Sequence, residues 1–349
     1  MAIVEIDKIS SVTKNLKLTQ REQLTDNLST RSGTVLAAQV LHDKSIYDEM
    51  ELPTGRMSKL KKDDIIAVAL GERMALKGFV GHLPKTLKTN DVINLLNFGG
   101  IAGICTSANT REVGEPLRIR VLGGIARKGK LLNIDQAALF KPATKLTSDI
   151  PLILITAGSM DSGKTTVASE IIKTLTRIGM RLAAAKLTGV GAMRDLYRME
   201  DYGVYESVSF VDAGVTSTAN VDPKLVVNVG KGALNYLSRK GIKGGKPDAI
   251  IVELGDGILG SYGVVQILKD KEFQKRVRLH ITCARDPAGA LKLAEDCAKF
   301  GVPVEVISGP ITDNEVGKAI IKDHLDIMTY NAFTPSNEWL DLVIARWAV

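Results

Sequence analysis

The sequence predicts an α/β protein in which a smaller β-rich domain precedes a mostly parallel sheet covered by helices. Three observations support this class. From residue 151 onward, short apolar runs alternate with helix-like segments, which is the pattern of βαβ units. A glycine-rich turn stands between the first of these runs and its helix. Before that point, short apolar runs are separated by turns rich in Gly, Asn and Pro.

The N-terminal domain is expected over residues 1–148. It holds the candidate strands 34–41, 65–70, 92–96 and 117–122. A stretch with two prolines and several Ser and Thr residues, 142–151, is the candidate linker to the C-terminal domain.

The net positive charge lies entirely in the N-terminal domain. Residues 1–148 carry 22 Lys and Arg against 15 Asp and Glu, whereas residues 149–349 carry 24 of each. Such an excess suits an anionic partner and equally suits a solvated basic surface. No basic run is interleaved with aromatic residues as a stacking platform would require, so nucleic acid is the weaker expectation.

A phosphate-binding turn follows the first run, 152–157, of the C-terminal domain, residues 149–349. The turn reads Gly158, Ser159, Met160, Asp161, Ser162, Gly163, Lys164, Thr165 and Thr166, and these residues are the expected cofactor-binding set. It fits the P-loop pattern G-x-x-x-x-G-K-[ST] between a strand and a helix. Glycine lets backbone N–H groups converge on a polyphosphate. Lys164 would neutralise the β- and γ-phosphate oxygens, and Thr165 would offer its hydroxyl to Mg²⁺.

The later strand ends provide the other candidates, because ligands bind beyond the carboxyl ends of parallel strands. The runs are 181–186, 208–211, 248–253, 277–283, 302–307 and 325–329. Lys186 ends the second run and would contact the substrate or the transferred phosphoryl group; a lysine that snorkels to the surface is the alternative. Glu253 ends the fourth run, and a carboxylate in that buried position suits a metal ion.

Further positions follow the same strands. Asp212, after the third run, is the other expected metal ligand, with a helix or turn cap as an equal alternative. Thr188 and Gly189, after Lys186, and Asp256, after Glu253, are expected on the substrate side. Asp195 and Asp201 are weaker candidates, because their segment has the pattern of an amphipathic helix with ordinary solvent-facing charges.

The cysteine spacing and the apolar runs argue against a cysteine-bound metal site, a disulfide-rich fold and a membrane-spanning protein. Cys105, Cys283 and Cys297 have no metal-ligand spacing, and their odd count argues against a disulfide framework. No apolar run approaches the roughly 20 residues that span a bilayer. Residues 1–8 do not have the pattern of a signal peptide. We therefore expect a cytoplasmic protein with no membrane partner.

These segments together resemble the dethiobiotin-synthetase-like (SIMIBI) branch of P-loop proteins, which includes the cobyrinate amidases and MinD-type ATPases. Dethiobiotin synthetases carry a Lys-Pro-Val-x-x-Gly-like turn, here residues 186–191, and a Val-Glu-Gly-x-Gly-Gly strand end, here residues 252–257. The resemblance implies metal positions at Thr165 and Glu253, and phosphate and substrate positions at Lys164 and Lys186. It also implies a homodimer across the nucleotide face.

Residues 151–290 are also similar to the DUF1611 family, whose characterised members act as D-amino-acid N-acetyltransferases. The matching order is Lys164, Thr188-Gly189, Asp212-Ala213-Gly214, Glu253 and Asp286-Pro287. The loop 161–165 is similar to that of Clp1-type polynucleotide kinases, although their second strand ends in an acidic pair rather than a lysine.

The sequence therefore predicts an ATP- and Mg²⁺-dependent enzyme of the kinase or ligase kind. It would transfer a phosphoryl group to a small anionic metabolite, or activate a carboxylate of one, with Lys164, Lys186 and Glu253 as catalytic residues. One alternative is an acyl-CoA-dependent amino-acid N-acetyltransferase of the DUF1611 type. Another is a partner-regulated switch NTPase or a polynucleotide kinase.

Overall fold

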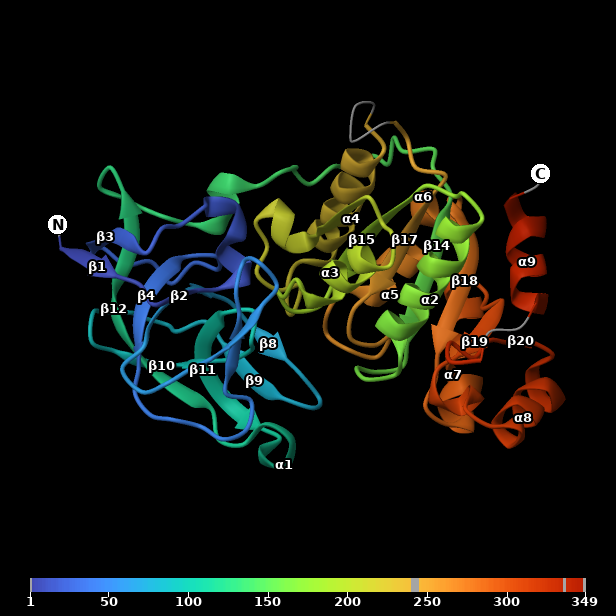
Figure 1. Cartoon of the computed structure of the whole chain (residues 1–349), viewed down its shortest axis with the longest axis horizontal. Coiled ribbons are helices and arrows are strands. Elements are labelled where there is room, and N and C mark those ends of the chain that lie inside the picture. Colours follow the sequence, from blue (N-terminus) through green and yellow to red (C-terminus); the bar gives the residue numbers. More distant parts are fainter. Residues whose placement is uncertain (1, 240–244, 335–336, 348–349) are drawn as a thin grey trace. The chain divides into compact units, whose positions relative to one another are not determined.

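The computed structural model describes residues 2–239, 245–334 and 337–347, and the chain forms two compact units (Figure 1). Unit 1 comprises Met1–Lys141, Gly189–Arg194 and Phe210–Asn220. Unit 2 comprises Pro142–Thr188, Asp195–Ser209 and Val221–Val349. Two short segments that follow strands of unit 2 therefore fold with unit 1. A domain boundary at residue 148 stays a prediction, and the observed units change at Lys141.

Unit 1 is built around strand pairings that close into a ring, in the order β12–β4–β7–β11–β10–β12. The ring strands are β4 (Val35–Val40), β7 (Ile65–Leu70), β10 (Val92–Leu95), β11 (Ile101–Ala108) and β12 (Leu117–Arg127). Alternate residues face a common core, as in Leu36, Ala38 and Val40 of β4. The strands expected at 34–41, 65–70, 92–96 and 117–122 are confirmed, whereas β11 was not predicted.

Shorter elements complete unit 1. The strands are β1 (Ile3–Glu5), β2 (Lys8–Ile9), β3 (Arg21–Thr25), β5 (Glu49–Glu51), β6 (Met57–Lys59), β8 (Arg73–Met74), β9 (Phe79–His82) and β13 (Lys130–Leu131). The helices are α1 (Thr110–Val113) and the 3₁₀ turns η1 (Ser11–Leu16), η2 (Ile134–Ala137) and η3 (Phe210–Ala213).

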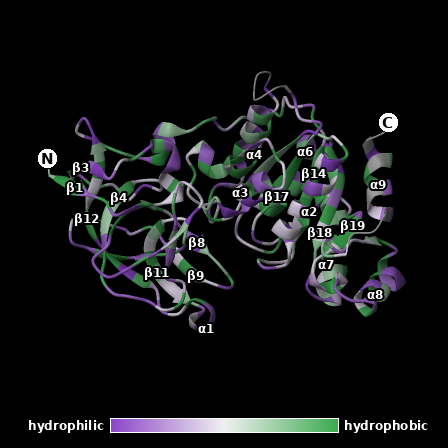
Figure 2. Ribbon diagram, in the orientation of Figure 1, coloured by the Kyte–Doolittle hydropathy of each residue, from purple (hydrophilic) through white to green (hydrophobic). Residues whose placement is uncertain are grey.

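Unit 2 contains a parallel sheet in the order β16-β15-β17-β14-β18-β19-β20. Its strands are β14 (Leu152–Ala157), β15 (Leu182–Thr188), β16 (Glu206–Ser209), β17 (Ala249–Leu254), β18 (Val277–Cys283), β19 (Val306–Ser308) and β20 (Met328–Thr329). Figure 2 shows the central strands β14 and β17 mostly in green, because nearly every residue of these strands is apolar. Continuous apolar runs of this kind are typical of parallel strands buried on both faces.

Helices cover the sheet of unit 2. They are α2 (Lys164–Arg177), α3 (Arg194–Asp201), α4 (Pro223–Leu237), α5 (Val264–Lys269), α6 (Lys271–Gln274), α7 (Pro287–Phe300), α8 (Glu315–Leu325), α9 (Asn337–Trp347) and the 3₁₀ turn η4 (Pro310–Thr312). One core is shared by α2, α3 and α9 with the strand residues that point toward them, among them Ala184 and Ile251. The start of α7 follows from its Asp-Pro pair, since Asp286 accepts a hydrogen bond from the Gly289 amide at 2.8 Å.

Three expected strands of unit 2 are shifted in the structure. The run 208–211 is half strand and half 3₁₀ turn, because β16 ends at Ser209. The run 302–307 becomes strand only from Val306. Within 325–329, Leu325 is the last residue of α8, and β20 begins only at Met328. Periodicity alone does not separate a short apolar strand from the end of a buried helix. Among the residues described, no helix has both the length and the apolar character to cross a bilayer.

Candidate functional site

The P-loop, residues 158–166, joins β14 to α2 in unit 2. Asp161 (φ +55°) and Gly163 (φ +91°) adopt left-handed backbone angles, and Gly163 is the N-cap of α2. Lys164, the first residue of α2, is buried, and its Nζ donates to the carbonyl oxygens of Ser159 at 3.0 Å and Asp256 at 2.7 Å. The ammonium is thus held at the loop by two neutral carbonyl oxygens. Phosphate oxygens could take their place, and their negative charge would make the hydrogen bonds stronger.

The loop after β17 packs backbone to backbone against the P-loop. A Cβ atom on Gly257 would lie 2.0 Å from the Gly158 carbonyl oxygen, and one on Gly255 would lie 2.3 Å from the Thr188 carbonyl oxygen. These separations are too short for any side chain. Glycine at both positions lets the residues that follow Glu253 reach the phosphate-binding turn.

Lys186 and Glu253 lie side by side at the carboxyl edge of the sheet. They are register partners in β15 and β17. Ala184 and Ile251, two residues earlier in each strand, belong to the core that packs on α2, so strand alternation directs Lys186 and Glu253 to the same face. Lys186 is 8 % exposed and Glu253 2 % exposed. The sheet therefore delivers a buried cation and a buried carboxylate to the start of α2.

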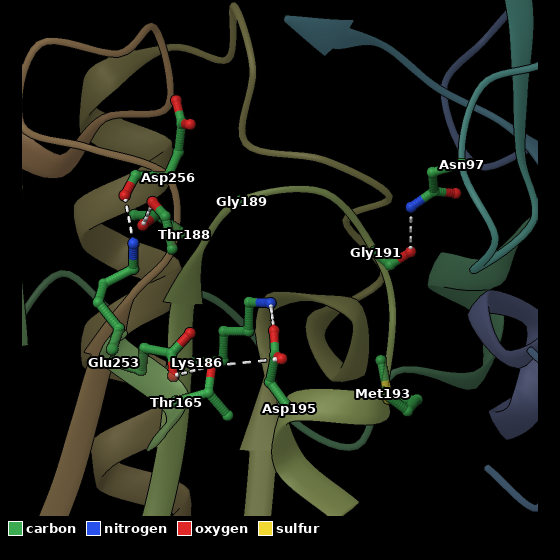
Figure 3. A network of polar contacts seen from close by, with 12 residues as sticks. Asn97, Thr165, Lys186, Thr188, Gly189, Gly191, Met193, Asp195, Glu253 and Asp256 are labelled. Carbon is green, nitrogen blue, oxygen red and sulfur yellow. Dashed lines mark hydrogen bonds and ion pairs between the residues drawn. The ribbon is translucent and has the colours of Figure 1, made fainter. Parts of the chain in front are cut away.

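A polar network connects these two residues to the P-loop (Figure 3). Thr165 Oγ1 lies 3.1 Å from Glu253 Oε2 and 3.4 Å from Asp195 Oδ1. The Lys186 ammonium forms an ion pair with the other Asp195 carboxylate oxygen. Burial, and then the nearby negative charge of Asp195, raise the pKa of Glu253 above its usual range.

These oxygen atoms fit a hard divalent cation. The Thr165 hydroxyl and the carboxylates of Asp195 and Glu253 supply oxygen donors from three different elements, α2, α3 and β17. Mg²⁺ is usually held by one or two carboxylates together with substrate phosphates, rather than by an all-protein cage. In the part of the chain that the structure describes, no cluster of three or more His, Cys, Asp or Glu side chains forms a metal site by itself. A cation at this position would thus be bound partly by these side chains and partly by phosphate oxygens.

Asp195 belongs to this network, although the sequence made it only a weaker candidate. It lies in the first turn of α3, the helix that follows β15. The helical charge pattern of residues 194–201 favoured a solvent-facing side chain. The start of a helix after a parallel strand, however, lies at the same sheet edge as the strand end, and this position is the signal that favours Asp195 as a site residue.

Asp212 lies in a different environment from the one expected for a metal ligand. It belongs to unit 1, is fully buried, forms an ion pair with Lys14 at 2.9 Å, and accepts a hydrogen bond from Asn15 Nδ2 at 3.0 Å. A buried carboxylate needs such a cation and hydrogen bond. These partners favour a structural role for Asp212 over the metal-ligand role.

The three expected substrate-side residues make structural contacts. The Thr188 hydroxyl donates a hydrogen bond to the Gly255 carbonyl oxygen at 2.9 Å. The Asp256 carbonyl oxygen accepts a hydrogen bond from the Lys164 ammonium. Gly189 (φ +122°) belongs to unit 1, where its amide donates to Thr218 Oγ1 at 3.0 Å. Contact with a substrate stays a prediction for all three.

The segment Gly189–Arg194, between Lys186 and Asp195, is bound within unit 1. The Gly191 carbonyl accepts a hydrogen bond from Asn97 Nδ2 at 2.8 Å (Figure 3). The Met193 amide donates to the buried Glu51 carboxylate at 2.7 Å. The chain thus leaves the site after β15, folds with unit 1, and returns to the site at Asp195.

No protein-family model and no curated protein matches the chain. Among solved structures, the hydrogenase maturation factor HypB from Archaeoglobus fulgidus has 17 % identity and a TM-score of 0.36, covering 57 % of this chain and 90 % of that one. Chloroplast FtsY from Physcomitrella patens has 13 % identity and a TM-score of 0.36, covering 56 % and 63 %. The signal recognition particle 54 kDa protein from Aeropyrum pernix K1, in complex with GDP, has 18 % identity and a TM-score of 0.37, covering 58 % and 47 %.

Similarity at this level does not transfer a function. Unit 2 nevertheless has the P-loop NTPase fold, because a P-loop joins the central strand of its parallel sheet to the following helix. Membership of the dethiobiotin-synthetase-like branch or of the DUF1611 family stays a prediction.

Proposed function

We propose that unit 2 binds ATP with Mg²⁺ and transfers the γ-phosphoryl group to a small anionic metabolite, as a kinase or a carboxylate-activating ligase does. The observation that carries this proposal is a second buried cation. Lys164 is the lysine that a P-loop requires to hold a nucleotide. Lys186 is buried near the carboxyl end of β15, which is separated from the P-loop strand β14 by β17. It adds a positive charge that suits an acceptor anion and the charge of a migrating phosphoryl group.

Each side chain of the network has a distinct part in this reaction. Lys164 would exchange the carbonyl oxygens of Ser159 and Asp256 for β- and γ-phosphate oxygens. Thr165, Asp195 and Glu253 would hold Mg²⁺, which neutralises phosphate charge when it is bound. Lys186 would orient the acceptor. The acceptor oxygen bonds to the γ-phosphorus as the bond to the bridging oxygen breaks, so that ADP leaves; a carboxylate acceptor would become an acyl phosphate.

Two measurements test the proposal together. Calorimetric titration with ATP and Mg²⁺ should show binding by the wild type and by Lys186→Met, and loss of binding by Lys164→Ala. Incubation with pools of small carboxylates and phosphate esters should identify a pool that supports ADP release. That release should collapse in Lys186→Met and persist in Lys173→Met, a surface control on α2 paired only with its neighbour Glu170 among the ion pairs described.

The outcomes separate the parts of the proposal. A wild type that does not bind ATP contradicts nucleotide binding itself. Full ADP release by Lys186→Met in the active pool contradicts the assigned role of the second cation. Stabilisation by acetyl-CoA in place of ATP would favour the acyltransferase alternative.

A partner-regulated NTPase is the second candidate, and one observation favours it. Asp195 directly follows the segment Gly189–Arg194, which folds with unit 1. A partner that binds unit 1 would therefore act on the backbone that positions a metal-side carboxylate. This candidate predicts slow ATP or GTP hydrolysis without any metabolite, and faster hydrolysis once the partner protein is added.

A further inference from the structure

Glu51, the last residue of β5, is a buried acidic side chain that the proposed reaction does not use. Among the residues described, unit 1 buries two other acidic side chains, and each of them has a cation. Asp212 is paired with Lys14 at 2.9 Å, and Glu22 with Arg127 at 3.7 Å. No ion pair in the described part of the chain involves Glu51. A buried charge without a counter-charge lowers stability, which indicates that Glu51 has a role other than stabilising unit 1.

Both hydrogen bonds to the Glu51 carboxylate reach the same oxygen, Oε2. The Met193 amide donates to this oxygen at 2.7 Å, and the Ser11 hydroxyl also donates to it. The other oxygen, Oε1, is buried and has no hydrogen-bond partner among the residues described. Hydrogen bonds to a carboxylate are roughly twice as strong as those between neutral groups. Glu51 thus holds the Met193 amide more firmly than a neutral acceptor would.

The segment Gly189–Arg194 is held within unit 1 at two separate places. In its first half, the Gly191 carbonyl oxygen accepts a hydrogen bond from Asn97 Nδ2 at 2.8 Å (Figure 3). In its second half, the Met193 amide binds Glu51. Without the Glu51 carboxylate, the first half would stay attached through Asn97. The hydrogen bond to Glu51 therefore acts on the end of the segment that leads into α3.

Met193 directly precedes α3, and Asp195 is the second residue of that helix. A hydrogen bond at the Met193 amide therefore fixes the backbone two residues before a carboxylate that is proposed to hold Mg²⁺. Mg²⁺ requires near-ideal octahedral geometry with ligands at about 2.0–2.1 Å, so its affinity depends closely on where a carboxylate lies. A small displacement of the first turn of α3 would thus weaken the cation site.

We propose that Glu51 is a positioning residue, which acts through the Met193 backbone to place the Asp195 carboxylate for Mg²⁺. The inference rests on the Mg²⁺-nucleotide site proposed above. It adds to that site a residue of unit 1 that stands 142 residues from Met193 in the chain. Changing a residue that orients a metal ligand typically costs about 10- to 100-fold in metal affinity. Unit 1 thereby affects cation binding without supplying a ligand itself.

The gain in ATP affinity from Mg²⁺, measured by calorimetry in Mg²⁺ and in EDTA, tests this role. Glu51→Met keeps a side chain of similar length and removes both acceptor oxygens. It should reduce the gain by roughly 10- to 100-fold and keep the wild-type affinity in EDTA. Glu51→Gln keeps an acceptor oxygen for the Met193 amide and should retain most of the gain. Glu51→Asp shortens the side chain by one methylene group and should lose part of the gain; it decides the test if Glu51→Met does not fold.

Two controls separate positioning from general stability. Glu22→Met is the matched variant, because Glu22 is also buried in unit 1 and accepts a hydrogen bond from the Thr19 amide at 2.7 Å. It should leave the gain from Mg²⁺ unchanged, even where it lowers Tm as much as Glu51→Met does. In a protein that already carries Asp195→Asn, Glu51→Met should cause no further loss of the gain, because both changes act through one carboxylate.

The outcomes distinguish this inference from the proposed function. A gain from Mg²⁺ that persists in full in Glu51→Met and Glu51→Asp overturns the positioning role and leaves the nucleotide site intact. Equal losses in Glu51→Met and Glu22→Met overturn it as well, because they indicate only a general destabilisation of unit 1. A wild type whose ATP affinity does not depend on Mg²⁺ contradicts the proposed cation site itself, and the positioning role with it.

Discussion

Replacing Lys186 by Met tests the physical basis of the network at the sheet edge. The substitution keeps an apolar stem of similar length and removes the ammonium. The ion pair with Asp195 is mostly buried, with side-chain exposures of 10 % for Lys186 and 24 % for Asp195. Without the Lys186 ammonium, the Asp195 carboxylate and the Glu253 carboxyl group would still contact the same Thr165 hydroxyl, with less positive charge nearby to compensate them.

The expected magnitude follows from this burial. Removing one partner of a fully buried ion pair costs about 3–5 kcal/mol. Asp195 retains some solvent and its contact with Thr165, so we expect Lys186→Met to lower the free energy of unfolding by about 2–3 kcal/mol. For a domain of this size that corresponds to a fall in Tm of roughly 4–12 °C.

Thermal unfolding followed by circular dichroism, without nucleotide, measures this effect. The double variant Lys186→Met with Asp195→Asn should recover most of the lost stability, because it removes both charges. Its loss of stability should therefore be smaller than the sum of the two single-variant losses. Lys173→Met serves as the surface control. A Tm for Lys186→Met within about 1 °C of wild type, or additive single-variant losses in the double variant, would refute the buried ion pair as a source of stability.

Three further predictions concern other parts of the fold. Burial lowers the pKa of His280 to about 4. The native state therefore binds fewer protons than the unfolded chain between pH 6.5 and pH 4. The free energy of unfolding should fall by about 3 kcal/mol as the pH drops through this range. His280→Gln should flatten that dependence in urea unfolding at several pH values. Gly257→Ala should weaken ATP binding at least about tenfold, because its Cβ atom would lie 2.0 Å from a P-loop carbonyl oxygen. Gly289→Ala on α7 is the control and should leave ATP binding unchanged, because the closest atom to its Cβ would lie 3.4 Å away. Lys14→Met should lower the free energy of unfolding by about 3 kcal/mol, because it removes a cation that is paired with the buried Asp212 carboxylate. Asp212→Asn should leave the affinity for Mg²⁺-ATP unchanged if the carboxylate is structural.

The three charged residues that the sequence singled out for catalysis share one property: each stands where its neighbours predict an apolar or glycine-rich environment. Lys186 and Glu253 end apolar runs, and Lys164 follows a glycine turn. Such a charge has few explanations other than a ligand or a partner charge. Because parallel strands share one carboxyl edge, the proximity of these residues could also be predicted from the order of the motifs.

The remaining features depend on partners distant in the sequence. Asp212 suited a metal ligand and a helix or turn cap equally well from the sequence, and its partner Lys14 stands almost 200 residues earlier in the chain. Strand β11 was not predicted, and it closes the ring in unit 1 through pairings with β7 and β10.

We propose that Asp195, Glu253 and Thr165 form one Mg²⁺-dependent nucleotide site with the P-loop. The affinity for ATP, measured by calorimetry in Mg²⁺ and in EDTA for the wild type and for Asp195→Asn, tests this site. Mg²⁺ should tighten ATP binding to the wild type, and Asp195→Asn should lose most of this gain but keep the wild-type affinity in EDTA. An undiminished gain from Mg²⁺ in Asp195→Asn would show that the Asp195 carboxylate does not hold the cation.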